Sequence, residues 1–294
     1  MVGQSKVRSV IEKVDALRTR EGAGFLVNRP FPIGELSYID PFLLLDEMGP
    51  EHLGPRQAKV APNHPHRGFE TVTYMLEGTL EHKDSNGNHG ILRPGDVQWM
   101  TAGSGLIHDE MPEEEFFERG GMMHGFQLWV NLPAAQKFIA PRYQDTPSEK
   151  IPVVTSDDGL VKIKVIAGKA LGREAVIETR TEISYLHFTL SAGAVFEQPI
   201  PPGHNAFAYV FEGSLKLGDE QCKRGQMAIF GEDGASVSMV VDQGAKEEAQ
   251  LLLLTGAPIN EQVSRYGPFV MNTPDQITEA MRDFQDGKMG RLKE

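Results

Sequence analysis

The sequence has little cysteine, less basic than acidic charge and no long apolar run, and each shortage excludes a class of protein. Cys222 is the single cysteine among 294 residues, so no intrachain disulfide can form and no thiolate cluster can hold a metal. The longest apolar stretch, residues 251–254, is far too short to span a bilayer. Residues 1–20 lack the apolar run of a signal peptide. We therefore expect a soluble, cytoplasmic protein that does not bind a membrane.

The shortage of basic side chains argues against nucleic acid as a direct partner. Acidic residues outnumber basic ones by 41 to 29, which gives a net charge of −12. Proteins bind phosphate backbones mainly through Lys and Arg that displace counterions. Hydrophobic residues make up 40% of the chain, enough for a full core, and the length suits one large or two ordinary domains.

Short β-rich runs separated by turn signals dominate the chain. The turns include Asn86-Gly87 and residues 93–96, and the runs include residues 71–76 and 206–211. Many short strands at regular spacing are typical of an all-β sandwich or barrel. One helix is predicted near the end, at about residues 273–287, because the segment begins with a capping box and continues with apolar residues at helical spacing.

An internal repeat indicates two domains of similar build. Residues 69–80 align with residues 204–215, and Tyr74 and Gly78 of the first segment meet Tyr209 and Gly213 of the second. We therefore expect two β-barrels, one over residues 1–135 and one over residues 136–294, with the helix closing the second.

Two ligand-x-ligand triplets are the main candidates for a functional site. His64-Pro65-His66 and His108-Asp109-Glu110 both lie in predicted strands, where residues i and i+2 share a face. On neighbouring strands they bring three imidazoles and one carboxylate into one space. That set of donors suits Fe, Mn, Ni, Cu or Zn and leaves two positions of a six-coordinate metal open.

The repeat alignment assigns the metal to the first barrel alone. His64 and His66 fall opposite Pro199 and Pro201, and His108 falls near Val237 or Ser238. One functional site beside one scaffold domain explains this asymmetry better than a purely structural role for the triplets does.

Several other polar residues remain as candidates with open alternatives. Glu70 shares the strand parity of the first triplet, so it can reach the metal, orient a ligand or be a buried carboxylate satisfied by backbone donors. Arg67 can pair with an acidic residue or bind an anionic substrate. His82 and His89 flank the predicted hairpin turn at Asn86-Gly87 and are expected in solvent, whereas His124 is expected in the core.

Long motifs around both triplets resemble the pirin family, whose members are bicupins. The resemblance lies in residues 64–78 and 94–112, and it extends from near the start of the chain to its closing helix. It implies two cupin barrels, that is, double-stranded β-helices of the jelly-roll type. It also implies a single metal, most often iron, held by side chains that correspond here to His64, His66, His108 and Glu110.

The resemblance leaves two functions open. The first is an enzyme of the quercetin 2,3-dioxygenase type, which opens a flavonol ring with O₂, with Fe(II) as the expected metal and Mn, Ni, Cu, Zn or Co as alternatives. Glu110 or Glu70 is then the candidate catalytic base. The second is a non-enzymatic regulator that binds a partner protein, such as a transcription factor, according to the redox state of its metal. We favour the enzyme and expect a monomer; its substrate need not be a flavonoid.

Overall fold

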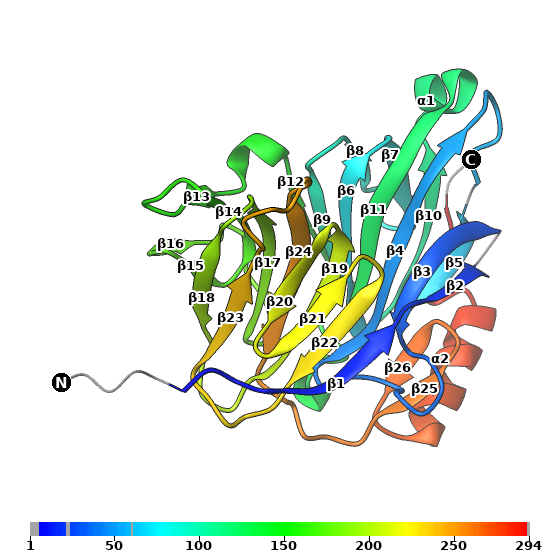
Figure 1. Ribbon diagram of the computed structural model, residues 1–294. Helices are drawn as coiled ribbons and strands as arrows, with labels where there is room; N and C mark the ends of the chain where they lie inside the picture. Colours follow the sequence, from blue (N-terminus) through cyan, green and yellow to red (C-terminus); the bar gives the residue numbers. More distant parts are fainter. Residues whose placement is uncertain (1–5, 22–23, 60, 293–294) are drawn as a thin grey trace. The chain divides into compact units, whose positions relative to one another are not determined.

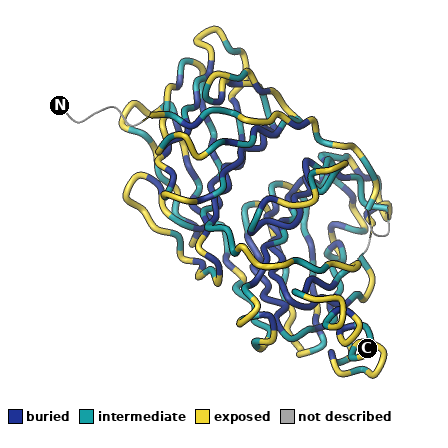
Figure 2. Tube along the Cα trace, turned by 90° about the horizontal axis from the view of Figure 1, so that it is seen from below, coloured by how far each residue is buried: buried dark blue, intermediate teal, exposed yellow. Residues whose placement is uncertain are grey.

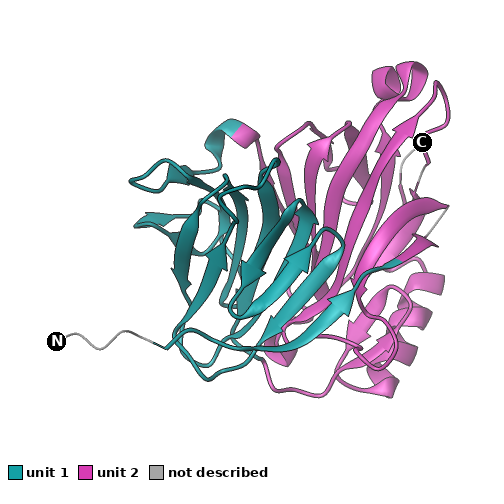
Figure 3. Cartoon of the chain, viewed as in Figure 1, with its two compact units in different colours: residues 1–17, 149–258 teal, residues 18–148, 259–294 magenta. Residues whose placement is uncertain are grey.

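The computed structural model describes residues 6–21, 24–59 and 61–292, and its regular structure is almost entirely β-strand (Figure 1). The chain divides into two compact units, which Figure 3 shows in different colours. Unit 1 combines residues 1–17 with 149–258, and unit 2 combines residues 18–148 with 259–294. The all-β fold class and the short C-terminal helix are therefore confirmed. No helix within the described ranges is both long enough and apolar enough to cross a membrane.

Unit 2 contains a seven-stranded sheet, a four-stranded sheet and a small hairpin. The strand orders are β12-β9-β6-β11-β4-β3-β2 and β5-β10-β7-β8, and β25 pairs with β26. The strands are β2 (Leu17–Glu21), β3 (Phe25–Phe31), β4 (Phe42–Leu53), β5 (Ala61–His66), β6 (Phe69–Glu77), β7 (Leu80–Asp84), β8 (His89–Leu92), β9 (Val97–Thr101), β10 (Leu106–Pro112), β11 (Gly121–Asn131), β12 (Arg142–Thr146), β25 (Ser264–Tyr266) and β26 (Phe269–Met271). The helices are α1 (Glu114–Arg119), the 3-10 turn Ala134–Gln136 and α2 (Pro274–Gln285).

Unit 1 repeats this pattern of sheets. Its seven-stranded sheet has the order β1-β22-β19-β24-β17-β14-β13, its four-stranded sheet has the order β18-β23-β20-β21, and β15 pairs with β16. The strands are β1 (Val10–Asp15), β13 (Val153–Thr155), β14 (Val161–Ala167), β15 (Lys169–Ala170), β16 (Arg173–Glu174), β17 (Ile183–Leu190), β18 (Val195–Pro199), β19 (Asn205–Glu212), β20 (Ser214–Leu217), β21 (Glu220–Lys223), β22 (Gln226–Phe230), β23 (Ser236–Val240) and β24 (Ala249–Gly256). A 3-10 turn, Ser148–Lys150, precedes β13.

The two sheet orders match strand for strand, which agrees with the repeat detected in the sequence. β6 of unit 2 corresponds to β19 of unit 1, and the pair β5–β10 corresponds to β18–β23. The edge strands of the two seven-stranded sheets differ in origin. In unit 2 the strand next to β9 is β12, whereas in unit 1 the strand at the equivalent edge is β1, which precedes the other described strands in the chain. β1 pairs with β22 from Val10↔Phe230 to Asp15↔Gln226.

Each unit therefore includes a segment from the other side of the predicted boundary near residue 135: residues 1–17 belong to unit 1, and residues 259–294 belong to unit 2. The N-terminal strand belongs to unit 1 because it completes the edge of that sheet, which a linear division of the chain does not anticipate. Residues 259–294 belong to unit 2, where α2 packs against β25 and β26. The helix begins as predicted: the Thr273 side chain accepts from the backbone N–H of Gln276, and the Gln276 side chain accepts from the backbone N–H of Thr273.

The interiors of the two units differ in polarity, although both bury the inner faces of their strands (Figure 2). A large apolar cluster in unit 1 includes Val165, Phe188, Leu217 and Val237. Unit 2 instead buries several polar and charged side chains between smaller apolar clusters. Buried polar groups need hydrogen-bond partners or metal ions, so unit 2 is where a functional site is expected.

Candidate metal centre

Strands β5 and β10 bring the three predicted histidines together. The strands are antiparallel, and His108 pairs directly with His64, while His66 lies two residues further along the same face of β5. The ring centroids are 4.3 Å apart for His64 and His108, 4.8 Å for His64 and His66, and 5.0 Å for His66 and His108. One nitrogen from each ring can be chosen so that all three lie within 4.8 Å of one another. This is the spacing that a common metal ion requires.

The electrostatics of the cluster fit a metal ion. Burial, and then the neighbouring imidazoles, hold the pKa of His66 and of His108 well below the usual range of histidine, so both rings are neutral. Both nitrogens of His108 are buried and have no hydrogen-bond partner among the described residues. A buried imidazole without a partner is costly, and a coordinated metal removes that cost.

Two backbone carbonyls orient the other two rings. The Nδ1–H of His64 donates to the carbonyl oxygen of Pro62 at 2.9 Å, and the Nδ1–H of His66 faces the carbonyl oxygen of Pro268 at 3.4 Å. Carbonyl oxygens only accept, so both rings must carry their proton on Nδ1. Each Nε2 then keeps its lone pair for a metal, as is usual for histidine ligands.

Glu110 lies beside the histidines but outside the tightest cluster. It follows His108 by two residues on β10, although the pairing of β10 with β5 shifts register between them. Its Oε1 lies 3.3 Å from the hydroxyl of Thr73, which in turn lies 2.9 Å from the side-chain oxygen of Gln127. Glu110 lines the same cavity as His64 and His66. Its role as fourth ligand remains a prediction.

Glu70 lies on the opposite face of β6 from this site. Its strand pairs with β9 and β11 in unbroken register from Glu70 to Thr73, so residues 70 and 73 point in opposite directions. Because Thr73 faces Glu110, Glu70 faces away from it. Glu70 is fully buried and accepts a 2.6 Å hydrogen bond from Thr101. The structure does not bring it to the histidines, contrary to the parity argument.

The reason for this difference is a turn between β5 and β6. Gly68 has φ +89°, and a Cβ at this position would overlap the carbonyl oxygen of Val270. The turn joins strands of two different sheets, so side-chain parity does not continue from His66 to Glu70. This turn at Gly68 invalidates the parity argument for Glu70.

The remaining histidines of this unit are distributed unequally between core and surface. His124 is buried and its Nε2 lies 2.9 Å from Glu47, as expected of a core histidine. His89 is half exposed and lies 2.6 Å from Glu81. The prediction for His82 was wrong, because this ring is 1% exposed. It pairs with Glu110 across β7 and β10 and so shares the inner face.

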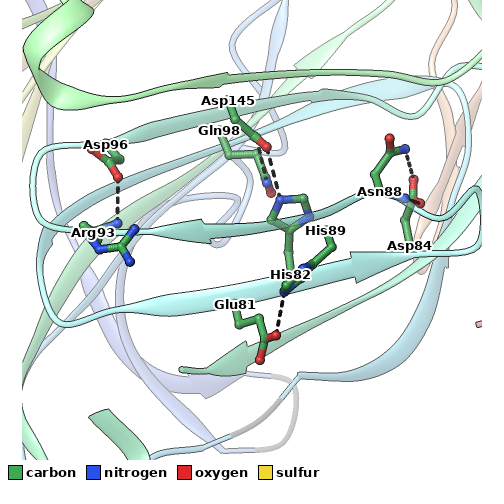
Figure 4. Close-up of polar contacts among 9 residues, drawn as sticks. All are labelled: Glu81, His82, Asp84, Asn88, His89, Arg93, Asp96, Gln98 and Asp145. Carbon is green, nitrogen blue, oxygen red and sulfur yellow. Dashed lines mark hydrogen bonds and ion pairs between the residues drawn. The ribbon is translucent and has the colours of Figure 1, made fainter. Parts of the chain in front are cut away.

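Figure 4 shows the surroundings of His82. Its Nε2 lies 3.4 Å from Oδ2 of Asp145, whose Oδ1 accepts a 3.0 Å hydrogen bond from Gln98. The ring stacks on Tyr143 with centroids 5.0 Å apart. The inner face near Glu110 is therefore polar well beyond the three histidines.

A cavity of about 720 Å³ opens onto the cluster. Its lining includes His64, His66 and Glu110, together with Arg29 and Arg265. The apolar lining side chains are Phe25, Val27, Leu44, Met48, Leu80 and Trp129. The volume lies in the range of small-molecule sites, and a mostly apolar lining with a few polar groups is typical of them.

The C-terminal segment of unit 2 contributes contacts that the sequence motifs did not reveal. The backbone of Arg67 bonds on both sides to residues of this segment: its N–H faces the oxygen of Pro268, and its oxygen accepts from Val270. The Arg67 side chain is buried, and it donates to Ser104 at 2.7 Å and to Asp283 of α2 at 2.9 Å. In the sequence, only the extension of the family resemblance to the closing helix pointed to this part of the chain.

Comparison with known proteins decides the family. The pirin family model matches residues 24–130, and the model described as the pirin C-terminal cupin domain matches residues 185–290. The chain belongs to the pirin family. The resemblance seen in the motifs is confirmed, and the two units of this pirin-family protein are cupin barrels.

Relatives from plants, animals and bacteria share most of its length. The chain is 42% identical to a pirin-like protein of Solanum lycopersicum, covering 97% of this chain and 94% of that protein. It is 42% identical to pirin of Homo sapiens, covering 92% and 90%. A crystal structure of quercetin 2,3-dioxygenase from Acinetobacter baumannii matches with TM-score 0.91 and 36% identity, covering 98% of this chain and all of that one.

In unit 1 the positions that the repeat alignment places opposite the ligands carry other side chains. Pro199 is exposed at the end of β18, and Val237 packs in the apolar core. Within the described residues, the group of side chains arranged to hold a metal is the one on β5 and β10.

Proposed function

We propose that this protein is a metal-dependent dioxygenase that opens a ring of a flavonol-type substrate with O₂, an activity of the quercetin 2,3-dioxygenase kind. The observation that carries the proposal is the cavity of about 720 Å³ that opens onto His64 and His66. A cavity of this size accommodates a three-ring aromatic molecule. The similarity to a protein solved as quercetin 2,3-dioxygenase supports the same activity.

In this proposal the metal is Fe(II), held by His64, His66, His108 and Glu110. When bound, the metal supplies Lewis acidity and a template for the reacting oxygens. The neutral state of His66 and His108 favours coordination over protonation.

The protein side chains have two tasks. Glu110 accepts the proton of the substrate hydroxyl, because its carboxylate lines the cavity on the same strand as His108. We assign this role to Glu110 and not to Glu70, which lies on the other face of its strand. Trp129, Leu44 and Met48 provide apolar walls that exclude water from the reacting ring.

Aerobic incubation of the iron-loaded protein with quercetin tests the proposal. We expect loss of flavonol absorbance and release of carbon monoxide over many equivalents per metal, only with both metal and O₂ present. His66→Ala should abolish turnover, whereas His89→Ala, on an exposed hairpin strand, should leave it unchanged.

A negative result would have a specific meaning. If iron is confirmed bound and less than one equivalent of quercetin is consumed, the dioxygenase proposal fails. The alternative is then a regulator whose affinity for a partner protein changes when its metal is oxidised. A binding measurement with the metal in both oxidation states would examine that role.

A further inference from the structure

The two arginines of the cavity are in different states. Arg29 uses all three of its guanidinium nitrogens in ion pairs. Its Nε and Nη2 donate to the two carboxylate oxygens of Asp46 at 2.7 and 2.6 Å, and its Nη1 donates to Glu21 at 2.7 Å. Arg265 donates one hydrogen bond, from Nη1 to the carbonyl oxygen of Leu43 at 3.1 Å, and forms no ion pair with a described residue. A guanidinium has five N–H donors, so four of those of Arg265 remain for a ligand.

Arg265 is held close to the histidine cluster by an aromatic ring. Its guanidinium carbon lies 4.8 Å from the centre of the Trp129 ring, in the geometry of a cation–π contact. The Trp129 ring in turn lies 5.3 Å from the ring of His66. The Trp129 indole therefore lies beside both the guanidinium of Arg265 and the imidazole of His66. An aromatic ligand that touches the metal has its far end within reach of Arg265.

The charges around Arg265 leave it as the receptor for an anion. The charged groups that act on it are Arg29, Asp46 and Glu21, and both of these carboxylates are bonded to Arg29. Gln127, another polar lining residue, is bonded to Thr73. A guanidinium is always charged and binds carboxylate or sulfonate oxygens through two parallel hydrogen bonds.

From these contacts we infer that the cavity selects aromatic substrates that carry an anionic oxygen group on the end distal to the metal, and that Arg265 binds this group. This inference rests on the proposed function and defines its substrate class more narrowly. Arg265 is a specificity residue in this scheme: it binds the substrate without taking part in ring opening.

Equilibrium binding tests the inference separately from catalysis. The ligands are quercetin and a quercetin sulfonated on its pendant ring, added without O₂ to iron-loaded protein so that neither is consumed. Quenching of tryptophan fluorescence reports binding, because Trp129 lines the cavity whereas Trp99 is fully buried. The variants are Arg265→Gln, which removes the charge, and Arg265→Lys, which keeps it without the planar fork. Arg56→Gln is the matched control, since Arg56 is an exposed arginine paired with Glu118.

We expect the wild-type protein to bind the sulfonated ligand about ten-fold more tightly than quercetin, which corresponds to ~1.4 kcal/mol. Arg265→Gln should abolish this preference, Arg265→Lys should retain part of it, and Arg56→Gln should retain all of it. High salt should weaken the preference only where the charge at residue 265 is present.

The outcomes separate the inference from the proposed function. If both ligands bind and Arg265→Gln leaves their ratio unchanged, the inference is overturned while the dioxygenase proposal stands. If the preference depends on Arg265 but neither ligand is consumed when O₂ is admitted, the inference stands and the proposed function fails. If neither ligand binds, both are overturned.

Discussion

The Nδ1 atom of His66 and the carbonyl oxygen of Pro268, 202 residues apart in the chain, face each other at 3.4 Å. This contact fixes the proton of His66 on Nδ1 and leaves Nε2 for a metal. The backbone bonds of Arg67 to the same segment hold it in place. The buried Lys137 adds a further tie, because its ammonium donates to the oxygens of Gly68 at 2.8 Å and Val270 at 3.0 Å. The geometry of the histidine cluster thus depends on residues 268–270 as well as on its own two strands.

The first prediction concerns metal content. The protein should bind about one metal ion per chain, and the double variant His64→Ala/His108→Ala should bind almost none, because it removes two of three clustered imidazoles. Elemental analysis after dialysis measures this directly. His89→Ala serves as the control. Full occupancy in the double variant would rule out the site.

The second prediction concerns Glu110. Glu110→Gln keeps the size of the side chain but removes its charge, so metal affinity should fall about ten- to a hundred-fold. Competition with a chelator measures the affinity. Asp109→Asn, the adjacent position on the other face of β10, should change it little. Equal affinities for the wild-type protein and Glu110→Gln would remove Glu110 from the ligand set.

The third prediction concerns the link between the ligand strand and α2. Arg67→Met removes a buried guanidinium and leaves Asp283 and the oxygen of Ser104 without it, so the free energy of unfolding should fall by about 3 kcal/mol. Denaturant titration measures the loss. The exposed pair of Arg56 and Glu118 is the matched control, and Arg56→Met should change stability little. Comparable effects of the two substitutions would contradict a structural role for the buried pair.

The fourth prediction is a pH dependence. The hydrogen bond from Lys288, and then the interaction with Arg67, hold the pKa of Asp283 below its usual value. The unfolded chain therefore binds a proton at higher pH than the folded one does. The stabilisation by the Asp283 carboxylate is complete above the ordinary aspartate pKa of about 4. It is lost as the pH falls through the lower pKa that Asp283 has in the folded protein.

Asp283→Asn removes this contribution and tests it. The variant should be less stable than the wild-type protein near neutral pH, and the difference should shrink as the pH falls below about 4. Asp286→Asn, at an exposed position near the same helix end, should follow the wild-type curve closely. A stability difference between wild type and Asp283→Asn that did not vary with pH would show that Asp283 does not titrate differently in the two states.

Much of the fold and the centre of the site could be predicted because both depend on local patterns. The alternation of side chains in a strand determines that His64 and His66 share a face, and the second triplet, on β10, supplies His108. The capping box at Thr273 is likewise a local signal, and the helix begins there. The repeat could be read because equivalent strands retain the same turn residues.

The wrong predictions, for Glu70 and His82, concern residues close to a turn between two strands. The parity of Glu70 was counted through Gly68, where the chain turns from one sheet into the next. His82 was assigned to solvent from its distance to the exposed turn at Asn86. Its cross-strand neighbour, Glu110, lies on the inner face, and cross-strand pairing decides burial.

Long-range contacts leave no pattern in a single sequence. Nothing in the sequence near Arg265 or Pro268 indicates that Pro268 faces His66 or that Arg265 lies over Trp129, because both contacts follow from how the C-terminal segment packs in unit 2. For the same reason the exchange of the two termini between units could not be read from the repeat alone.

That exchange has a consequence for how the protein is made. On the ribosome, the strands that carry His64, His66 and His108 are complete long before residues 264–290 emerge. Until then His66 lacks the carbonyl of Pro268 and Arg67 lacks Asp283. Unit 1 has the opposite timing, since its strand β1 is synthesised first and must wait for β22. A centre of this design reaches its final geometry only after residues 264–290 have been synthesised, so we expect a metal to be held in that geometry only from then on.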